Sequence, residues 1–474
     1  MPQPRNIYLL DPRLLSPETI AVAFAKTSRS PQTFQEIADE LSDEKSADFH
    51  EKWVVGYGHS SVAEHAVIHV ALENVSRLSV ECIESNRLAS YTEKSSRYQV
   101  WDRKHFYLPP ELSGNQLEKA YINLCTRLFD HYQTAFEKVT THLLTNEPRK
   151  SDETERAYTQ RIRTICADVC RYYLPASALA NVGMTINARA LEYAITKLLS
   201  HPLEEVQEIG NEIKSSSRLI VPTLVKYANE NNYIKSLPQK IEIITTDQIS
   251  PESNCDWLKC VGFDPEGEAN VLTALLFRFS EQPFIQAKAI IQNLGMEQKQ
   301  NLAQTLLGNL GDHDIPLREL EYASINFEIL LDQGAYFELK RHRMMTQTPQ
   351  SLTTRQGFMI PRLLEESGNL ETFLKDMAEV QAVFEQLYAF NPHVASYVVP
   401  NAFNRKVLVQ MNLRSALHFV KLRSASNAHF AIRRVAARIA EEIKVHYPLF
   451  AKFFCTSEPE TWESISTSYF THLS

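Results

Sequence analysis

The sequence lacks the usual signatures of a metal site, a phosphate loop or a covalent nucleophile. None of its seven cysteines stands at the two-residue spacing typical of structural zinc sites, so we expect reduced core thiols and no bound metal. No Gly-rich phosphate loop and no Gly-x-Ser-x-Gly elbow occurs, and no cysteine lies beside the arginine-rich motif described below. These absences argue against a metalloenzyme and against covalent catalysis by a serine or cysteine of the protein.

Long apolar runs and an excess of positive charge are also missing. Hydrophobic residues make up 44% of the chain, yet no stretch approaches the ~20 apolar residues that a membrane-spanning helix needs, and the N-terminus has no signal-peptide run. A net charge of −8 argues against a general nucleic-acid-binding surface. We therefore expect a soluble, cytoplasmic protein that binds small molecules, with no nucleic-acid or membrane partner.

The two halves of the chain resemble each other. Residues 81–98 read ECIESNRLASYTEKSSRY, and residues 337–354 read FELKRHRMMTQTPQSLTT. Matching landmarks recur 256 residues apart for Arg87/Arg343 and Ser95/Ser351, and 225 residues apart for Pro175/Pro400 and Asn187/Asn412. Internal repetition in register indicates duplication, and 474 residues suffice for two domains. The prediction is an α+β protein of two tandem domains, residues 1–235 and 236–474.

Hydrophobic periodicity predicts the elements within each half. Alternating apolar residues predict strands at 7–12, 66–75, 240–247 and 324–331. Apolar residues at helical spacing predict helices at 117–146, 153–172 and 370–390, and helix pairs after residues 187 and 412. Capping residues at 424–427 predict a break in the last pair, which places Arg423 at the end of a helix.

Clustered arginines in an acidic protein predict the capture of an anion, because the guanidinium fork matches phosphate and carboxylate oxygens. For each arginine taken alone, a surface salt bridge is the competing interpretation. His342, between two of these arginines, either titrates near neutral pH or packs as a neutral polar group. The candidates are Arg97, Arg171, Arg341, Arg343 and Arg423.

These motifs together resemble the flavin-dependent thymidylate synthases. The likeness rests on Arg-His-Arg followed after seven residues by Ser351, on GHSSVAEH at 58–65, and on NARA and NLRS at 187–190 and 412–415. The resemblance implies an α+β fold and a homotetramer whose FAD and dUMP sites are built from several subunits. It also implies transfer of a one-carbon unit from methylenetetrahydrofolate to uracil C5, with NADPH reducing FAD.

The resemblance assigns roles residue by residue. The implied substrate-binding residues are Glu93, Ser95, Arg97, Arg171 and Arg341. The implied cofactor-binding residues are Glu93, Asn187, Arg189, Arg341, His342, Arg343, Asn412 and Arg414. Arg423 matches the uracil-contacting arginine, whose expected role is to stabilise negative charge on the base.

The two halves have lost complementary parts of this set. The first has Leu198 where the second has Arg423, and the second has Thr353 where the first has Arg97. We interpret this as a composite site, in a homodimer that mimics the family tetramer. The sequence leaves open whether such a site lies within or between chains, and the family pattern favours the latter.

Departures from the family pattern keep two alternatives open. A family asparagine is Tyr193 in the first half and His418 in the second. One alternative is C5 modification of another pyrimidine nucleotide. The other is a non-catalytic flavin- or nucleotide-binding homologue.

Overall fold

The computed structural model describes residues 6–28, 30–56, 60–102, 105–245, 256–311 and 313–472. The chain forms two compact units, which do not coincide with the two halves of the sequence. Unit 1 comprises Met1–Ser95, His105–Glu118 and Ser177–Pro251, and unit 2 comprises Ser96–Lys104, Lys119–Ala176 and Glu252–Ser474. Residues 119–176 therefore belong to the same unit as the C-terminal half. The predicted duplication boundary falls within a helix of unit 1 and stays a prediction.

Unit 1 is built on a three-stranded antiparallel sheet of strand order β1-β3-β2. Its elements are α1 (Pro17–Thr27), α2 (Phe34–Asp39), α3 (Asp43–Phe49), the π-helical turn η1 (His50–Gly56), the 3₁₀ helix η2 (Ser60–His65), β1 (Val67–Ser76), α4 (Arg77–Ile83), β2 (Ala89–Glu93), the 3₁₀ helix η3 (Pro110–Leu112), β3 (Leu179–Asn187), α7 (Ala188–Leu199), α8 (Glu204–Ser217) and α9 (Asn232–Thr245).

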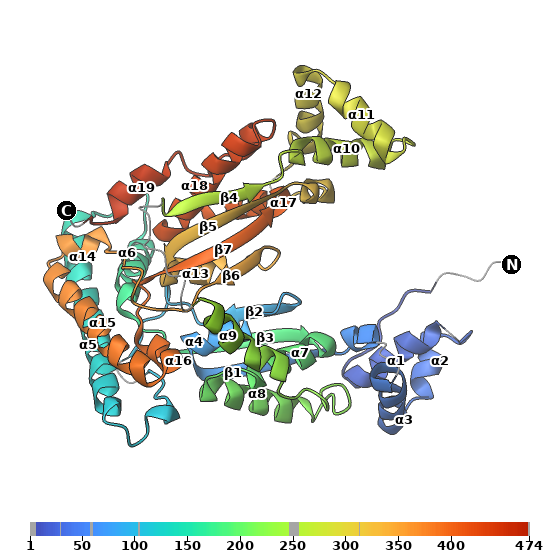
Figure 1. Ribbon diagram of the computed structural model, residues 1–474, viewed down its shortest axis with the longest axis horizontal. Helices are drawn as coiled ribbons and strands as arrows, with labels where there is room; N and C mark the ends of the chain where they lie inside the picture. Colours follow the sequence, from blue (N-terminus) through green and yellow to red (C-terminus); the bar gives the residue numbers. More distant parts are fainter. Residues whose placement is uncertain are drawn as a thin grey trace. The chain divides into compact units, whose positions relative to one another are not determined.

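Unit 2 is built on a four-stranded antiparallel sheet of order β4-β5-β7-β6 (Figure 1). Its helices are α5 (Leu117–Asn146, which begins in unit 1), α6 (Glu155–Cys170), α10 (Gly267–Phe279), α11 (Phe284–Asn293), α12 (Met296–Leu307), α13 (Gln333–Leu339), α14 (Arg362–Glu366), α15 (Leu370–Phe390), α16 (Pro392–Ala395), α17 (Leu413–Arg423), α18 (Phe430–His446) and α19 (Trp462–Tyr469). Its strands are β4 (Leu258–Phe263), β5 (Ser324–Asp332), β6 (Thr346–Pro349) and β7 (Asn404–Asn412). Its 3₁₀ helices are η4 (Arg171–Tyr173), η5 (Arg318–Tyr322), η6 (Ser396–Val398) and η7 (Ala451–Phe453).

Side chains that alternate along β5 and β7 form the core of unit 2. Phe327 and Ile329 of β5 are fully buried, as are Val407 and Val409 of β7. Helix α18 contacts both β4 and β5, and its Ile439 is fully buried. The core thus holds α18 against the sheet, and α18 also contacts α13.

The same order of strands and helices occurs in both units. In unit 1, β1, α4 and β2 are followed by β3, α7 and α8; in unit 2, β5, α13 and β6 are followed by β7, α17 and α18. The strand registers reproduce the sequence offsets, because Glu93 pairs with Val182 and Pro349 pairs with Val407, 256 and 225 residues further on. This repetition is what a tandem duplication predicts.

Helix caps repeat as well. Ser76 accepts a hydrogen bond from the Ser79 N–H at the start of α4, and Asp332 accepts one from the Ala335 N–H at the start of α13. A β-bulge between Leu72 and Val75 adds one residue to β1 that β5 lacks. The chain therefore reaches both caps in the same register, although the two strands differ in length.

Most elements predicted from periodicity are confirmed, including α5 and α15 at their predicted bounds. Two predicted strands are wrong. Ile7 and Leu9 are 85% and 94% exposed and lie in no strand, so the apolar run at 7–12 buries no face in a sheet. Residues 240–245 belong to α9, where Ile234, Leu237 and Ile241 recur at helical spacing; residues 246–247 lie outside the described part. A short alternating run does not distinguish strand from helix.

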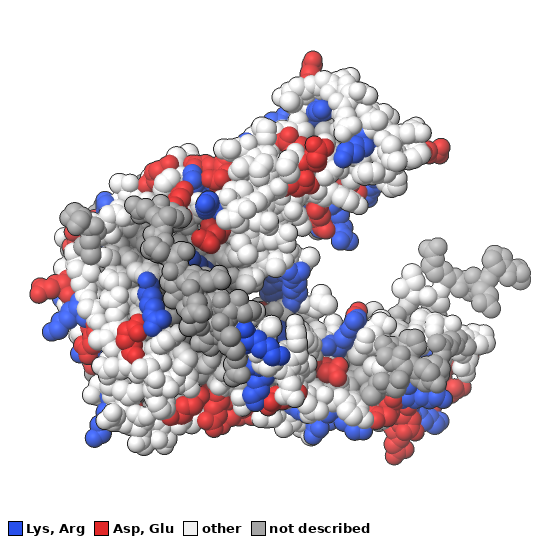
Figure 2. Space-filling model, viewed as in Figure 1, with Lys and Arg blue, Asp and Glu red and all other residues white. Residues whose placement is uncertain are grey.

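Within the described ranges, no helix combines the length and apolar character needed to cross a membrane. Figure 2 shows basic and acidic side chains interspersed over the face in view, in keeping with the modest net charge.

Candidate functional site

Arg423 is the last residue of α17, and two side chains hold its guanidinium group. Its Nε donates to Nε2 of His342 over 2.9 Å, and its Nη1 donates to Oε2 of Glu338 over 3.2 Å. Helix α17 ends here and α18 begins at Phe430, as the capping residues at 424–427 predict. The break therefore presents Arg423 from the end of a helix.

Glu338, on α13, shares its carboxylate between two arginines. Its Oε1 accepts from Nη2 of Arg171 at 3.5 Å, while its Oε2 accepts from Arg423. The Glu338 side chain is only 6% exposed, so both ion pairs are shielded from water. One buried anion thus ties an arginine of the N-terminal half of the sequence to an arginine of the C-terminal half, within unit 2.

His342 is a neutral acceptor in this cluster. Burial, together with the positive charges of Arg423, His418 and Arg341, lowers the pKa of His342 to about 3. Since Nε2 accepts from Arg423, the ring proton belongs on Nδ1. The ring also packs edge-on against Phe419, with centroids 4.9 Å apart. Its buried position, its contact with Arg423 and its packing on Phe419 therefore favour the second interpretation of His342, a neutral polar group.

Arg171 is buried against the first turn of α13. A Cβ atom at Gly334 would lie 3.3 Å from Nη2 of Arg171 and 3.0 Å from Oδ1 of Asp332, so the absence of a side chain there leaves room for the guanidinium group. Asn401 donates to the Arg171 carbonyl over 2.9 Å. Burial raises the pKa of Asp332 to about 6, against the opposing charge of Arg171.

Arg97 forms a two-pronged ion pair with Asp168 on α6. Its Nε and Nη2 donate to the two carboxylate oxygens over 2.7 and 2.9 Å, and its Nη1 donates to the carbonyl of Asn427 over 3.0 Å. Burial alone would lower the pKa of Arg97. The hydrogen bonds to Asp168 and the negative charge of Asp168 have the larger effect and raise this pKa above its ordinary value. Nε2 of His429, the N-cap of α18, lies 3.1 Å from the Asp168 carbonyl.

The cluster carries an excess of positive charge. Burial lowers the pKa of Arg423, and the negative charge of Glu338 raises it. The positive charges of Arg341 and Arg97 lower this pKa further, so these guanidinium groups repel one another. Burial also holds the pKa of His429 well below its ordinary value, which leaves this imidazole neutral. The arginines therefore exceed the buried carboxylates in number, and the cluster is suited to an additional anion.

Arg341 and Arg343 lie on the turn that follows α13. Arg341 is exposed and Arg343 is partly buried. Gln347 fixes this turn, since its Nε2 lies 3.1 Å from the carbonyls of both Leu339 and His342. Of the three residues of the Arg-His-Arg motif, Arg341 is thus the most exposed to solvent.

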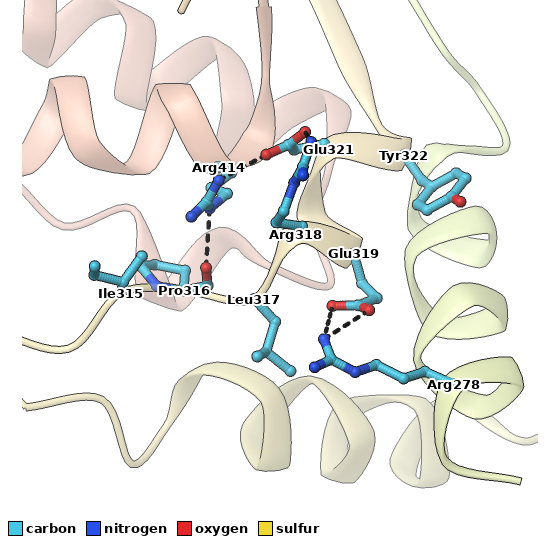
Figure 3. Close-up of a pocket in the computed structure, with 9 residues that line it drawn as sticks. All are labelled: Arg278, Ile315, Pro316, Leu317, Arg318, Glu319, Glu321, Tyr322 and Arg414. Atoms are coloured by element: carbon cyan, nitrogen blue, oxygen red, sulfur yellow. Dashed lines mark hydrogen bonds and ion pairs between the residues drawn. The ribbon is translucent and has the colours of Figure 1, made fainter. Parts of the chain in front are cut away.

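Asn412 and Arg414 stand at the start of α17, and Arg414 lines a separate hollow of about 660 Å³ in unit 2 (Figure 3). Asn412 caps the helix by accepting from the Ser415 N–H over 2.8 Å. Arg414 donates to the carbonyl of Pro316 over 2.9 Å and to Glu321 over 2.7 Å, as Figure 3 shows. Both side chains are thus engaged in local structure.

The remaining predicted residues belong to unit 1. Asn187 caps α7 through the Ala190 N–H over 2.9 Å, and Arg189 pairs with Glu64 over 2.5 Å. Glu93 forms a buried ion pair with Arg77 over 3.1 Å, and Ser95 follows β2 by two residues. The roles that the resemblance gives to these four residues stay predictions.

Sequence reasoning missed Glu338 and Asp168, which position Arg423 and Arg97. Aligned at the 256-residue offset, Glu338 corresponds to Cys82 and His342 to Asn86, just as Arg423 corresponds to Leu198 at the 225-residue offset. The second half thus carries a complete Glu-His-Arg set, and the first half replaces every member. This parallel replacement is the signal that could have identified Glu338.

The comparisons with known proteins agree with this repeated organisation. The model of a family described as thymidylate synthase complementing protein matches residues 12–223 and 263–449. A UPF0159 protein of Chlamydia muridarum is 28% identical over 432 residues, which cover 87% of this chain and 82% of that protein. A UPF0159 protein of Thermoplasma acidophilum is 26% identical over 449 residues, which cover 87% and 89%.

Matches to shorter proteins cover about half of the chain. A flavin-dependent thymidylate synthase of Clostridium tetani is 28% identical over 218 residues, which cover 45% of this chain and 82% of that enzyme. A crystal structure of the flavin-dependent thymidylate synthase of Helicobacter pylori, complexed with FAD and dUMP, matches at 18% identity and a TM-score of 0.30, covering 45% of this chain and 96% of that one. Because the family model spans most of the sequence, the chain belongs to the thymidylate synthase complementing protein family, the family of the flavin-dependent thymidylate synthases.

Proposed function

We propose that the protein transfers a one-carbon unit from methylenetetrahydrofolate to C5 of dUMP, with FAD as cofactor and NADPH as reductant. We further propose that the site is composite, with Arg97 and Arg171 from the first half acting beside Arg341, His342, Arg343 and Arg423 from the second. One observation carries this proposal: Arg171 and Arg423 share the carboxylate of Glu338 within unit 2. Family membership supports the reaction class.

The donor set fits a phosphate-bearing cofactor and substrate. Guanidinium groups bind phosphate oxygens through paired hydrogen bonds, and the exposed Arg341 with the neighbouring Arg343 offers such donors on a turn that Gln347 fixes. These two arginines would hold the phosphates or the ring edge of FAD. When bound, FAD would supply the hydride that reduces the transferred carbon.

Arg423 is the residue that would act on the pyrimidine. Glu338 and His342 hold its guanidinium fork from two edges, so little reorganisation remains when negative charge develops on the base. Because His342 is neutral, it fixes Arg423 without competing for that charge. Preorganised electrostatic stabilisation, in place of an enzyme nucleophile, would lower the barrier.

Arg97 would meet the nucleotide phosphate. Asp168 fixes two edges of its guanidinium group, while Nη1 donates to the neutral carbonyl of Asn427. A phosphate oxygen would replace that carbonyl with a charge-assisted contact. The ion pair with Asp168 would keep the side chain in place during the exchange.

The test is reconstitution with FAD, followed by an assay of dTMP formation from dUMP, methylenetetrahydrofolate and NADPH. Arg423→Ala should lower kcat/KM by a factor of about 10² to 10³, the loss typical of removing one preorganised donor. Leu198→Met, at the corresponding position of the first half, keeps the size of this buried side chain; it is the matched control and should change turnover little. Folded protein that neither binds FAD nor forms dTMP would refute the proposal.

The second candidate is the same chemistry on another pyrimidine nucleotide. His418, where the family has asparagine, has its ring centroid 5.7 Å from that of His342, so this departure lies next to the cluster itself. An assay with dCMP and UMP beside dUMP distinguishes the two. A homologue that only binds flavin or nucleotide would show binding without turnover of any of the three.

A further inference from the structure

A second cavity in unit 2 lies beside Arg97, at the N-terminal end of α18. Its volume is about 590 Å³, and residues of α5, α6, α14, α18 and α19 line it. Small-molecule sites typically have volumes of roughly 300–1,000 Å³. Its inner surface is mostly apolar, with Leu143, Ile165 and Leu363 among the lining side chains. The cavity therefore suits a ligand with an apolar body.

Aromatic rings form one wall of this cavity. The rings of Phe430 and Tyr469 are parallel within 4° and their centroids lie 5.0 Å apart. The ring of Tyr172 extends the stack, since it is parallel to Phe430 within 6° at 6.2 Å. Parallel, mutually packed rings form a rigid surface that flat aromatic ligands match well.

Arg433 brings a buried positive charge to the same cavity. The residue is only 7% exposed, and its Nε makes no hydrogen bond within the described part of the chain. The nearest carboxylate oxygen, on Glu460, lies 3.5 Å from Nε. An unsatisfied buried donor is costly, and a ligand acceptor would relieve that cost. The partial positive charge at the start of α18 acts in the same direction.

The charges around the cavity identify the kind of anion. Four arginines line it, at positions 97, 161, 362 and 433, against three acids, at positions 147, 168 and 366. Glu460, which pairs with Arg433, offsets this excess of one positive charge. A singly charged carboxylate therefore matches the cavity better than a phosphate monoester, which carries about −1.5 to −2 at pH 7. We infer that this cavity binds an aromatic or heteroaromatic carboxylic acid, with Arg433 contacting the carboxylate and Phe430 and Tyr469 packing against the ring.

The proposed function suggests which acid this is. Methylenetetrahydrofolate carries aromatic rings and a glutamate tail, so it belongs to the chemical class that the cavity selects. This naming of the natural ligand rests on the proposed function, whereas the class of ligand rests on the cavity alone.

The test is calorimetric titration of the 474-residue protein, without FAD or dUMP, using 2-naphthoate as the probe. The neutral isostere 2-naphthylmethanol and inorganic phosphate serve as comparison ligands. We expect 2-naphthoate to bind at least tenfold more tightly than the neutral alcohol, and phosphate to leave its binding unchanged. Equal affinity for the acid and the alcohol would overturn the inference, and so would displacement of 2-naphthoate by phosphate.

Two variants locate the binding within the cavity. Arg433→Gln should weaken 2-naphthoate binding at least tenfold, while Arg355→Gln, which alters an exposed arginine paired with Glu385, should not. Because Arg433 is buried, Thr164→Glu provides a second test: Thr164 lines the cavity on α6 and is partly exposed, so an acid there should fold normally and weaken binding about threefold or more. Unchanged affinity in folded Thr164→Glu protein would refute the site.

Reduced folate is the last arm of the test. Folinate should displace 2-naphthoate from the wild type, and it should do so less well from Thr164→Glu. Folinate that does not compete would overturn the assignment to the co-substrate. These titrations measure no turnover, so they test the cavity independently of the proposed function. A protein that binds these acids but forms no dTMP in the turnover assay would refute the proposed function and leave the cavity assignment standing.

Discussion

Replacing Glu338 with glutamine tests whether one buried carboxylate holds the arginine cluster together. The substitution keeps the shape of the side chain and removes the charge that Arg171 and Arg423 share at 3.5 and 3.2 Å. A unit charge at about 4 Å from another interacts by roughly 4 kcal/mol at an effective dielectric constant of 20. Breaking a buried ion pair by removing one partner typically costs about 3–5 kcal/mol, because the other charge stays buried. Since the glutamine oxygen keeps one arginine contact, we expect a loss of about 3 kcal/mol in the free energy of unfolding.

Urea unfolding followed by tryptophan fluorescence measures this loss in the relevant unit. Three of the four tryptophans, Trp101, Trp257 and Trp462, belong to unit 2, so the signal reports mainly on the unit that contains Glu338. The matched control is Glu385→Gln, which breaks a half-exposed ion pair with Arg355 and should cost less than about 1 kcal/mol. Equal destabilisation by the two variants would refute the view that Glu338 organises the cluster.

Three further predictions follow from the same geometry. Gly334→Ala should lower the free energy of unfolding by about 1–3 kcal/mol, because its Cβ would crowd the buried guanidinium group of Arg171. Gly183→Ala is the control and should be near neutral, because its Cβ would meet its nearest neighbour at 4.0 Å. Equal denaturation midpoints for the two variants would contradict the prediction. His342 has a folded pKa of about 3, so below pH ~6.5 the unfolded chain takes up a proton that the folded chain does not. The free energy of unfolding should therefore fall as the pH drops from about 6.5 toward 3, by up to about 1.4 kcal/mol per pH unit. In urea unfolding at several pH values, His342→Gln should lower that slope, and equal slopes for the variant and the wild type would count against the prediction. Arg97 and Arg423 interact within one chain, so each site would need both arginines from the same chain. The inactive Arg97→Ala and Arg423→Ala proteins should then stay inactive after they are refolded together into the predicted homodimer, whose formation sedimentation would check. Recovery of about a quarter of wild-type activity would place the sites between chains.

Local structure was predictable from the sequence wherever it depends on local signals. The break after Arg423 follows from capping residues that compete with the helix for backbone hydrogen bonds, and it is found at the predicted position. The caps at Asn187 and Asn412 have an equally local cause, although the resemblance gave both asparagines a role in flavin binding. A short polar side chain at the start of a helix first satisfies the helix itself.

The partners of the arginines were not predictable in the same way. Glu338 and Asp168 look like ordinary acidic positions on helices, and only contacts between distant segments make them buried anions. The assignment of α5 and α6 to unit 2 was missed for a related reason, since periodicity identifies the apolar face of a helix and not the surface that covers it. The expectation of sites shared between chains followed the family pattern and stays a prediction.

The interleaved course of the chain constrains the order in which the molecule forms on the ribosome. Helices α5 and α6 are complete once residue 170 has been made, yet the largest part of their unit, Glu252–Ser474, is made only later. Domains generally fold as units and the N-terminal one first, so unit 1 can close around β1, β2 and β3 while these two helices still expose their apolar faces. Nascent chains arrested near residue 250 should therefore recruit chaperones through the segment 119–176, and separate expression of the two sequence halves should yield two aggregation-prone fragments.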